Sequence, residues 1–557
     1  MMLKNKSHLT KIGILLVAIF AINWIGTKVY KRFDLTQDQR YTLSSSALAI
    51  VKDVKSPLLV DVFLEGDFPT EFRRLKNETQ QLLEEFALDN NQIKFNFINP
   101  LANEELRDRN IEQLAERGLE PLQLSVNKSG KTSQELIFPW ALASYNDQTV
   151  KIPLIKNKIG STEQELVSNS IQHLEYAFAE GFQKLVIPKS KKIAILKGNG
   201  ELEDRYLADF LQTLKDHYFI APFTLDSVAS NPDGSLDKLN QFDLIIAAKP
   251  TQAFSEEEKL VLDQFTMNGG KSLWLTESVA MDKDSLYNDQ NRGIAMIMDL
   301  NLNDFFFKYG VRINPVMVND MYSAPITIAM GEGSNAQFQP LRWPYSPLAA
   351  GNPDHPISSN LNLVKFDFAS PLDTLKNNVK KTVLLQSSNL TKLEGVPKEI
   401  SLEIVTQDPD PASYTAGPQM LSILLEGQFA SVYKDRILPF DVSSYKTLSP
   451  ETKMIIIADG DVIKNDVIKN QPQELGFDRW TGQSFGNKEF LLNAVNYLLN
   501  DDGLLNVRTK DINIGFLDDH KVAKQKTQWQ VINMVLPLLI LAIFGLVFTF
   551  LRRRKYT

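Results

Sequence analysis

FDLIIAAKPTQAFSEEEKLVLDQFTMNGGKSLWLTE, residues 242–277, decides the fold of the largest part of this chain. Its first apolar run, residues 242–248, is short and continuous, as in a buried strand. Residues 255–267 combine a serine at the start with apolar side chains at helical spacing, which predicts a helix. Residues 272–276 form a second apolar run and predict another strand. Strands that alternate with a helix in this way indicate a parallel, doubly wound α/β sheet.

The same alternation extends upstream, with a strand at 193–197, a helix at 202–217 and a strand near Phe223. Downstream the pattern is less regular, and residues 323–360 are rich enough in Gly, Pro and polar residues to predict a loop region. Apolar runs predict a helix and further strands at 304–309, 313–318, 364–368, 383–386, 402–405, 420–425 and 454–458, followed by a helix at 487–499. We expect later strands to complete the sheet, so that residues 191–515 form one large α/β domain with irregular insertions, or two interlocked ones.

Residues 57–190 precede this domain and carry a different order of elements. Periodicity predicts strands at 58–64, 93–98, 122–126 and 135–140 and helices at 70–88, 104–117 and 162–182. This order matches a thioredoxin-like α/β domain, with Pro121 just before the third strand. Because the chain contains no cysteine, such a domain cannot perform dithiol chemistry and is expected to bind or to act as a spacer.

Composition excludes several classes of function. The absence of cysteine rules out disulfides, thiolate metal sites and cysteine nucleophiles, and suits an oxidising compartment. The net charge is −7, and without the basic tails at residues 1–11 and 552–557 the rest of the chain carries −14. So acidic a surface repels nucleic acid.

Two apolar runs predict membrane spans. Residues 531–551 carry no charge and end at a basic tail, and residues 12–29 form a slightly shorter run. A cleaved signal peptide is the alternative for the first run, but no small-x-small site follows it. The basic tail places both termini in the cytoplasm and the middle of the chain outside the inner membrane, in the periplasm. Asn23, Asn533 and Pro537 are either contacts to a partner helix or irregularities tolerated in lipid.

The predicted organisation is therefore a tail and first transmembrane helix (1–32), a stalk (33–56), the two α/β domains, a juxtamembrane segment (516–530), and a second transmembrane helix with its basic tail (531–557).

Several segments resemble one known family. FDLT at residues 33–36, RYTLS at 40–44 and GDFP at 66–69 look like the start of the auxiliary proteins encoded with ABC-transporter ATPases and permeases. The segment LGFDRWTGQSFGNKEFLLNAVNYLLNDDGLLNVRTKDI, residues 475–512, resembles the G component of the gliding-motility ABC system. Residues 242–277 are similar to the glutamine-amidotransferase-like fold of this family, without its cysteine nucleophile.

The resemblance implies a non-catalytic subunit without a cofactor. Its implied partners are a multispanning permease, through it a cytoplasmic ATPase, and membrane lipid, and its implied role is gliding motility with export of surface proteins. A scaffold protein of the envelope without a transport role is the alternative.

Three sequence patterns match motifs of catalytic or ligand-binding sites. Gly482 to Gly486 fits the nucleophile elbow G-x-S-x-G with Ser484 as nucleophile, but the preceding residues make a poor strand. Residues 269–272 end like a phosphate-binding loop, yet the lysine leads into a strand rather than a helix. Asp459 and Asp461, with Asp354 and His355, are candidates for an oxygen-rich metal site, although Asp and Gly are also typical turn residues at strand ends. We expect no metal and no catalytic residue.

Aromatic residues supply the remaining candidates. Trp343, Tyr345 and Trp480 are candidates to line a carbohydrate or peptide groove, because flat rings provide contact area at low entropic cost. Aromatic residues next to prolines also anchor loops on a core. Together with His355, Asp459 and Asp461 they form the predicted ligand or partner surface, for an envelope protein or a glycan.

Overall fold

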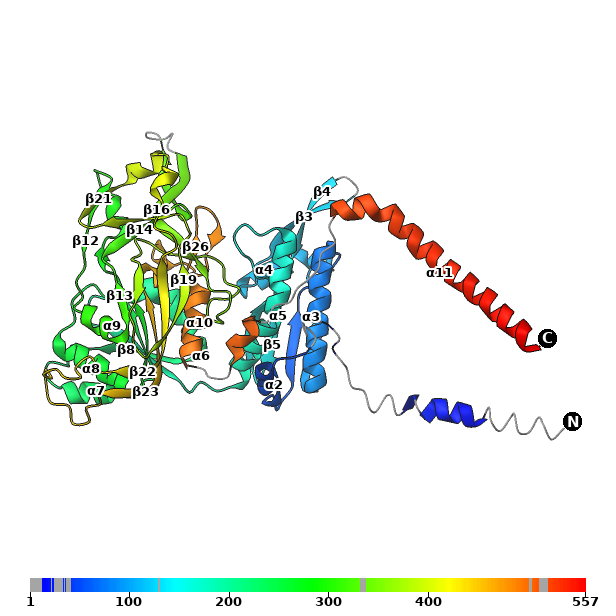
Figure 1. Cartoon of the computed structure of the whole chain (residues 1–557), viewed down its shortest axis with the longest axis horizontal. Helices are drawn as coiled ribbons and strands as arrows, with labels where there is room; N and C mark the ends of the chain where they lie inside the picture. Colours follow the sequence, from blue (N-terminus) through cyan, green and yellow to red (C-terminus); the bar gives the residue numbers. More distant parts are fainter. Residues whose placement is uncertain are drawn as a thin grey trace. The chain divides into compact units, whose positions relative to one another are not determined.

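The computed structural model describes residues 13–21, 23–24, 34, 36, 42–128, 131–330, 337–499, 503–509 and 519–556. The chain divides into two compact units, residues 1–511 and 512–557. The first unit is a mixed α/β structure built on a small sheet and a large sheet (Figure 1). This confirms the α/β class.

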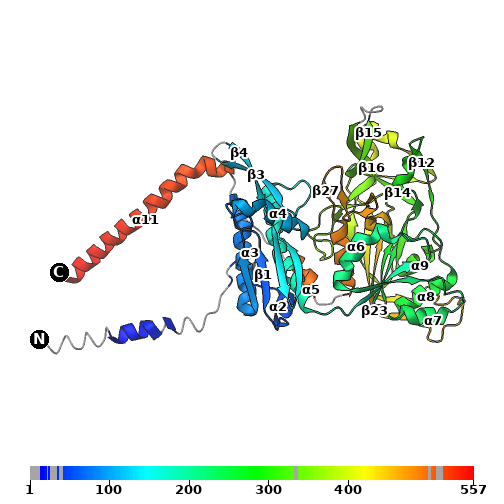
Figure 2. The ribbon, with the colours of Figure 1, turned by 180° about the vertical axis from the view of Figure 1, so that it is seen from behind.

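The small sheet has the strand order β2-β1-β5-β6. Strand β1 is parallel to β2 and antiparallel to β5, and β5 is antiparallel to β6. Helices α3 and α5 pack against each other and stand beside this sheet in both views (Figure 1, Figure 2). The elements of this part are α2 (Ser45–Lys52), β1 (Leu58–Val62), α3 (Thr70–Asp89), β2 (Ile93–Phe97), η1 (Glu104–Leu106), α4 (Arg107–Glu116), β3 (Leu122–Lys128), β4 (Lys131–Ile137), β5 (Trp140–Tyr145), β6 (Gln148–Pro153) and α5 (Glu163–Val186).

One expectation for this part is wrong. The strand predicted at 122–126 is not the third strand of the sheet, because β3 pairs only with β4 in a separate hairpin. The third strand is β5, whose alternate residues are buried, and the residue before it is Pro139 rather than Pro121. Strand β6 has few apolar residues and was not predicted.

The large sheet begins with five parallel strands in the order β8-β7-β9-β10-β23. Strand β23 comes from far down the chain and pairs with β10 in the register Ser272↔Met454. Antiparallel strands β22, β19, β16 and β15 extend the sheet beyond it. The prediction that later strands complete the sheet is confirmed. Its elements are β7 (Lys192–Lys197), α6 (Asp204–His217), β8 (Phe219–Thr224), α7 (Pro232–Leu239), β9 (Leu244–Ala248), α8 (Glu256–Met267), β10 (Lys271–Leu275), β15 (Ser323–Met330), β16 (Gln337–Gly351), β19 (Lys380–Gln386), β22 (Met420–Ala430), β23 (Leu448–Ile457) and α10 (Asn487–Leu499).

Alternate side chains of the parallel strands enter two different cores. Ile193 and Ile195 of β7 pack with α6 and α10 on one face, and Ala194 and Leu196 pack with α7, α8 and α9 (Asn303–Tyr309) on the other. Burial on both faces explains why these strands read as continuous apolar runs. The serine before α8, Ser255, forms a capping box with Glu258, which fixes the start of that helix.

Shorter elements complete the first unit, three of them as further strands of the large sheet. These are β11 (Val279–Ala280), η2 (Lys283–Leu286), β12 (Arg292–Ile297), α9 (Asn303–Tyr309), β13 (Val311–Ile313), β14 (Val316–Asp320), β17 (Val364–Lys365), β18 (Leu372–Thr374), β20 (Thr391–Gly395), β21 (Lys398–Ser401), η4 (Leu402–Thr406), η5 (Pro411–Ser413), η6 (Asp461–Ile463), β24 (Val467–Ile468), β25 (Gln471–Pro472), β26 (Phe477–Asp478), β27 (Gln483–Ser484) and η7 (Leu504–Thr509).

Two predictions in this region are wrong. Residues 323–360 were expected to be a loop, but most of them form the long hairpin of β15 and β16. Residues 402–405 were expected to be a strand, but they form the 3₁₀ helix η4, because the Ser401 hydroxyl accepts the backbone N–H of Glu403 and caps a helical turn there.

The second unit contains α11 (Asp519–Tyr556). Its segment Lys524–Arg554 is 31 residues long and, among the described residues, is the one helix long and apolar enough to cross a membrane. The predicted span 531–551 lies within it, with Asn533 on the helix and Pro537 inside it. Of the other predicted span, residues 13–21 and 23–24 are described and helical, Asn23 included.

Candidate functional site

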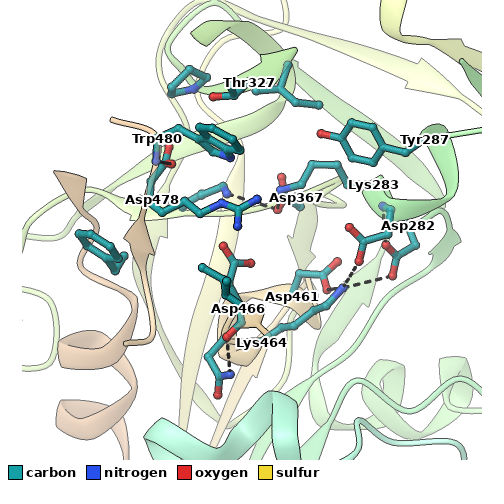
Figure 3. A pocket seen from close by; sticks show the side chains of 18 of the residues that line it. Asp282, Lys283, Tyr287, Thr327, Asp367, Asp461, Lys464, Asp466, Asp478 and Trp480 are labelled. Atoms are coloured by element: carbon teal, nitrogen blue, oxygen red, sulfur yellow. Dashed lines mark hydrogen bonds and ion pairs between the residues drawn. The ribbon is translucent and has the colours of Figure 1, made fainter. Parts of the chain in front are cut away.

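A cavity of about 910 Å³ lies over the carboxyl ends of the parallel strands. Its walls come from the first turn of α6, from η2, from the β15–β16 hairpin, and from the segments after β23 up to the start of α10 (Figure 3). The carboxyl ends of parallel strands are where open α/β sheets bind ligands, because the loops that follow the strands diverge there. The cavity is therefore the candidate functional site.

The lining is rich in charge of both signs. Seven acidic residues and five basic residues contribute to it, so that the lining has a net charge of −2. The acidic residues are Asp282, Asp284, Asp367, Glu403, Asp461, Asp466 and Asp478, and the basic ones are Arg205, Lys283, Lys365, Lys464 and Arg479. Most of these charges are paired.

Asp367 is the centre of the first set of pairs. Its carboxylate lies 3.0 Å from Lys283 Nζ and 3.7 Å from Lys365 Nζ, and it accepts a hydrogen bond from the Ser346 hydroxyl. Burial acts to raise the pKa of Asp367, but the two ammonium groups outweigh burial and hold this pKa well below its usual range. Burial lowers the pKa of Lys365, and the nearby charge of Lys283 adds to the effect.

Lys464 is the centre of the second set. Its Nζ lies 3.3 Å from Asp284, 3.5 Å from Asp282 and 3.9 Å from Asp461 (Figure 3). Burial acts to lower the pKa of Lys464, but these carboxylates outweigh burial and raise it. Because of these ion pairs, neither Lys464 nor its carboxylates can bind a ligand unless the pairs first separate.

Lys249 fills the place where a metal ion would be expected. Carboxylate oxygens of Glu277, Asp459 and Asp461 lie within 4.8 Å of one another, a spacing that suits a cation. Lys249 Nζ lies 2.7 Å from Asp461 and 3.1 Å from Glu277, so an ammonium already neutralises them. Burial together with the neighbouring carboxylates raises the pKa of both Asp459 and Glu277. These residues do not fit a metal while Lys249 is in place.

The mouth of the cavity is aromatic. Trp480 and Phe338 are 45% and 61% exposed, and their rings stack with centroids 4.7 Å apart. The guanidinium of Arg479 lies 4.5 Å from the centroid of the Trp480 ring. Asp478 fixes this corner, because its carboxylate accepts the backbone N–H of Trp480 at 2.9 Å. Tyr287, 55% exposed, stands on the opposite side (Figure 3).

The structure brings some of the predicted surface residues together and separates others. Asp461 and Trp480 line the cavity, and Asp459 lies directly beneath it, where it accepts the backbone N–H of Asp367. Trp343 and Tyr345 are 0% and 1% exposed and belong to a small core with Phe368. Their rings pack inside the protein and do not line the cavity.

His355 and Asp354 lie away from the cavity. The His355 ring is 5.1 Å from that of Tyr497, near the carboxyl end of α10, whereas Asn487 at the start of α10 lines the cavity. These two positions are ten residue steps apart, which is about 15 Å along the helix. Residues 354 and 355 therefore do not join Asp459 and Asp461.

Ser484 does not have the surroundings of a nucleophile. It lies exposed in the two-residue strand β27, and its carbonyl accepts a hydrogen bond from the Asn362 amide. Within the described part of the chain, no hydrogen bond joins its hydroxyl to a histidine. Lys271 begins β10, so residues 269–272 lack the helix of a phosphate-binding loop.

Sequence reasoning missed most of the charged residues of the cavity. Lys249 directly follows β9, at the end of the parallel sheet where ligands bind, so its position in the sequence could have identified it as a site residue. Lys283 and Lys464 come several residues after the ends of β10 and β23, and Asp367 follows the short strand β17, so no local pattern pointed to them.

A second charged cluster links three segments of the first unit. Arg508 of η7 forms an ion pair with Glu489 of α10, and Glu489 also forms an ion pair with Lys156, just before α5. The Arg508 guanidinium lies 5.0 Å from the centroid of the Tyr176 ring on α5 and donates a hydrogen bond to Asn493 at 3.3 Å. Because Arg508 is 3% exposed, this is a buried clamp.

Comparisons with known proteins place the chain in a family. The family described as "ABC-type uncharacterized transport system" matches residues 190–494, and a family described as a domain of unknown function matches residues 37–144. A curated protein of Borreliella burgdorferi, described as "Uncharacterized protein", is 22% identical over 406 residues, which are 71% of this chain and 72% of that one.

Two solved structures show distant likeness. The "mmIFT52 N-terminal domain" is 13% identical with a TM-score of 0.32, over 58% of this chain and all of that one. A putative ThuA-like protein from Parabacteroides merdae ATCC 43184 is 10% identical with a TM-score of 0.28, over 56% of this chain and 91% of that one. Neither carries an argument about function. The match over residues 190–494 spans more than half of the sequence, and the chain belongs to the ABC-type uncharacterized transport system family.

Proposed function

We propose that this chain is a non-catalytic auxiliary subunit of an ABC-transporter complex that serves bacterial gliding motility. The observation that carries the proposal is the family match over residues 190–494. The subunit is anchored in the inner membrane by two helices, its termini are cytoplasmic, and its large middle part lies in the periplasm. There it couples a multispanning permease to partners or substrate in the envelope, while a cytoplasmic ATPase hydrolyses the nucleotide.

Support for the anchor comes from α11 and its flanks. The helix contains the segment Lys524–Arg554, in which the uncharged run 531–551 is followed by Arg552, Arg553 and Arg554, and then by Lys555. Basic residues at the end of a span favour the cytoplasmic side. The apolar run at residues 12–29 supplies the second anchor.

Support for the two proposed domains comes from strand order. The sheet β2-β1-β5-β6, with β5 antiparallel to both neighbours, is the arrangement expected of a thioredoxin-like domain at residues 57–190. The five parallel strands with helices on both faces are expected of an amidotransferase-like domain at residues 191–515. Neither domain has a cysteine, so neither supplies the thiol chemistry of these folds, and we assign a binding role to both.

Support for coupling comes from the clamp around Arg508. Arg508 lies in η7, and α11 begins soon afterwards in the sequence, at Asp519. Its contacts reach α5 on one side and α10 on the other. In this proposal, a force on η7 acts on α5 and on α10 together, because Arg508 contacts both.

The test is purification of the tagged full chain from its native membranes, with mass spectrometry of what accompanies it. We expect a permease and an ATPase in fixed ratio. The matched control keeps the soluble part and replaces residues 524–554 with an unrelated membrane helix of equal length; it should stay in the membrane and lose the permease. Recovery of the chain alone, or equal recovery of the permease with the control, would contradict the proposal.

Motility is tested separately. A strain without the chain should fail to spread on a surface, and the wild-type gene should restore spreading only while the ATPase partner is active. Spreading that persists with a catalytically dead ATPase would indicate a scaffold instead.

A further inference from the structure

Two unlike charges in the cavity have no hydrogen bond and no ion pair to the described residues. Asp466 is exposed and lines the cavity; its carboxylate accepts no hydrogen bond and forms no ion pair with any described residue, and its charge acts on Lys283 and Lys365 only from a longer distance. Arg479 lines the same cavity and is exposed, and within the described part of the chain its guanidinium contacts only the Trp480 ring. No ion pair joins Asp466 to Arg479. The cavity thus offers, to a ligand that bridges them, one anion and one cation that are not engaged in a hydrogen bond or ion pair.

The other charges of the cavity explain why this pair stands out. Lys283 and Lys365 are held by Asp367, and Lys464 is held by three carboxylates. An incoming anion would have to displace these carboxylates, and the net charge of −2 opposes it. A purely cationic ligand would leave the Arg479 guanidinium without a partner, although a guanidinium binds a carboxylate well through two parallel hydrogen bonds.

We propose that the cavity binds a short peptide with a free amino group and a free carboxylate. The carboxylate of the ligand lies on Arg479, and its ammonium group lies on Asp466. The exposed rings of Trp480 and Phe338 at the mouth cover apolar side chains of the peptide. A volume of about 910 Å³ lies at the upper end of the range for ligand sites, about 300–1,000 Å³, which admits several residues.

Figure 3 shows the arrangement that this binding uses. Trp480 and Tyr287 stand on opposite sides of the cavity, and Asp466 lies between them on the side of Lys464. Backbone N–H and C=O groups of a bound peptide would face the polar groups of these walls. The inference goes beyond the accessory role, and its test requires no transporter.

The experiment measures binding of trialanine to the full chain by calorimetry. The chain is held in lipid nanodiscs, because alkyl-glycoside detergents would add sugar head groups. Two further probes each lack one charge: N-acetyl-trialanine and trialanine amide. We expect trialanine to bind about tenfold or more tightly than either, since each loses one charge-assisted contact.

Variants assign each charge to its partner. Arg479→Gln should weaken trialanine about tenfold and leave the amide unchanged, and Asp466→Asn should weaken trialanine equally and leave the N-acetyl peptide unchanged. Arg117→Gln, an exposed arginine on the N-terminal part, is the matched control and should change nothing. A change that merely disturbed the fold would weaken all probes together.

Three results would overturn the inference. They are absence of trialanine binding at 10 mM, binding that ignores both terminal charges, and binding of maltotriose in place of the peptides. The last would assign the cavity to a neutral sugar.

Discussion

Replacing Arg508 with methionine tests the clamp directly. The side chain of Arg508 is 1% exposed, and its removal leaves Glu489 with Lys156 alone and deprives Asn493 and the Ser359 carbonyl of a donor. Removing one partner of a buried ion pair costs about 3–5 kcal/mol. Since about 1.4 kcal/mol is a factor of ten, η7 should open at least about 100-fold more often.

Hydrogen exchange followed by mass spectrometry measures this opening, because it reports local unfolding segment by segment. In Arg508→Met, amides at residues 504–509 should exchange about 100-fold faster or more. Arg436→Met is the matched control, because Arg436 is half exposed and pairs with Asp304 at 2.7 Å. An exposed pair contributes about 0–1 kcal/mol, so exchange near Arg436 should rise less than about fivefold.

Exchange at residues 504–509 of Arg508→Met within threefold of the wild type would contradict this prediction. That result would mean that the apolar residues of η7, among them Leu504, Leu505 and Val507, hold the segment without the clamp.

Three further perturbations test other parts of the structure. Burial lowers the pKa of His217 to about 4. Between its unfolded value of about 6.5 and pH 4, the unfolded chain binds a proton that the folded chain does not, so the free energy of unfolding falls as the pH falls, by up to about 3 kcal/mol. His217→Phe should lose this part of the pH dependence in urea unfolding, and an unchanged dependence would refute the prediction. Lys249→Ala leaves Glu277 and Asp461 without the ammonium group and should destabilise the folded chain by about 3–5 kcal/mol. Millimolar Mg²⁺ or Ca²⁺ should raise the melting temperature of this variant but not of the wild type, and equal shifts in both would contradict the view that Lys249 occupies the place of a metal ion. Trp343→Ala should cost about 3–5 kcal/mol in thermal unfolding, as for a buried core ring, and a loss below about 1 kcal/mol would favour a groove-lining role instead.

The helices and parallel strands of the large sheet were predictable because a local pattern of apolar residues identifies each of them. The helix at 487–499 has its predicted bounds, since its apolar residues Phe490, Leu491, Ala494 and Leu498 recur at helical spacing and enter one core. Strands β9 and β10 were found because burial on both faces gives short apolar runs.

The hairpin of β15 and β16 was missed because its prolines imitate a loop. Strand β16 contains Pro340, Pro344 and Pro347, and its pairing with β15 shifts register between Ser323 and Pro325. Strands tolerate proline where the missing N–H faces away from the partner or where a bulge interrupts the ladder. Sequence alone does not reveal which of these conditions a proline meets.

The position of the cavity at the strand ends was predictable from the sequence, but most of its lining residues were not. Asp461 and Trp480 were candidates from sequence, the aspartate because it follows a strand end. Asp367 and Lys283 meet across 84 residues of sequence, and only the folded chain makes them a pair.

The position of β23 has a consequence for biosynthesis. It lies between β10 and β22 in the sheet, although residues 276–447 separate it from β10 in the chain. A ribosome must therefore make nearly the whole chain before the large sheet can close, and contacts so distant in sequence form slowly. Until then, β10 exposes an unpaired edge that can pair with another chain. The nascent protein needs shielding over this interval, and any product that ends before residue 448 lacks the strand that completes its parallel sheet and becomes a substrate for proteolysis.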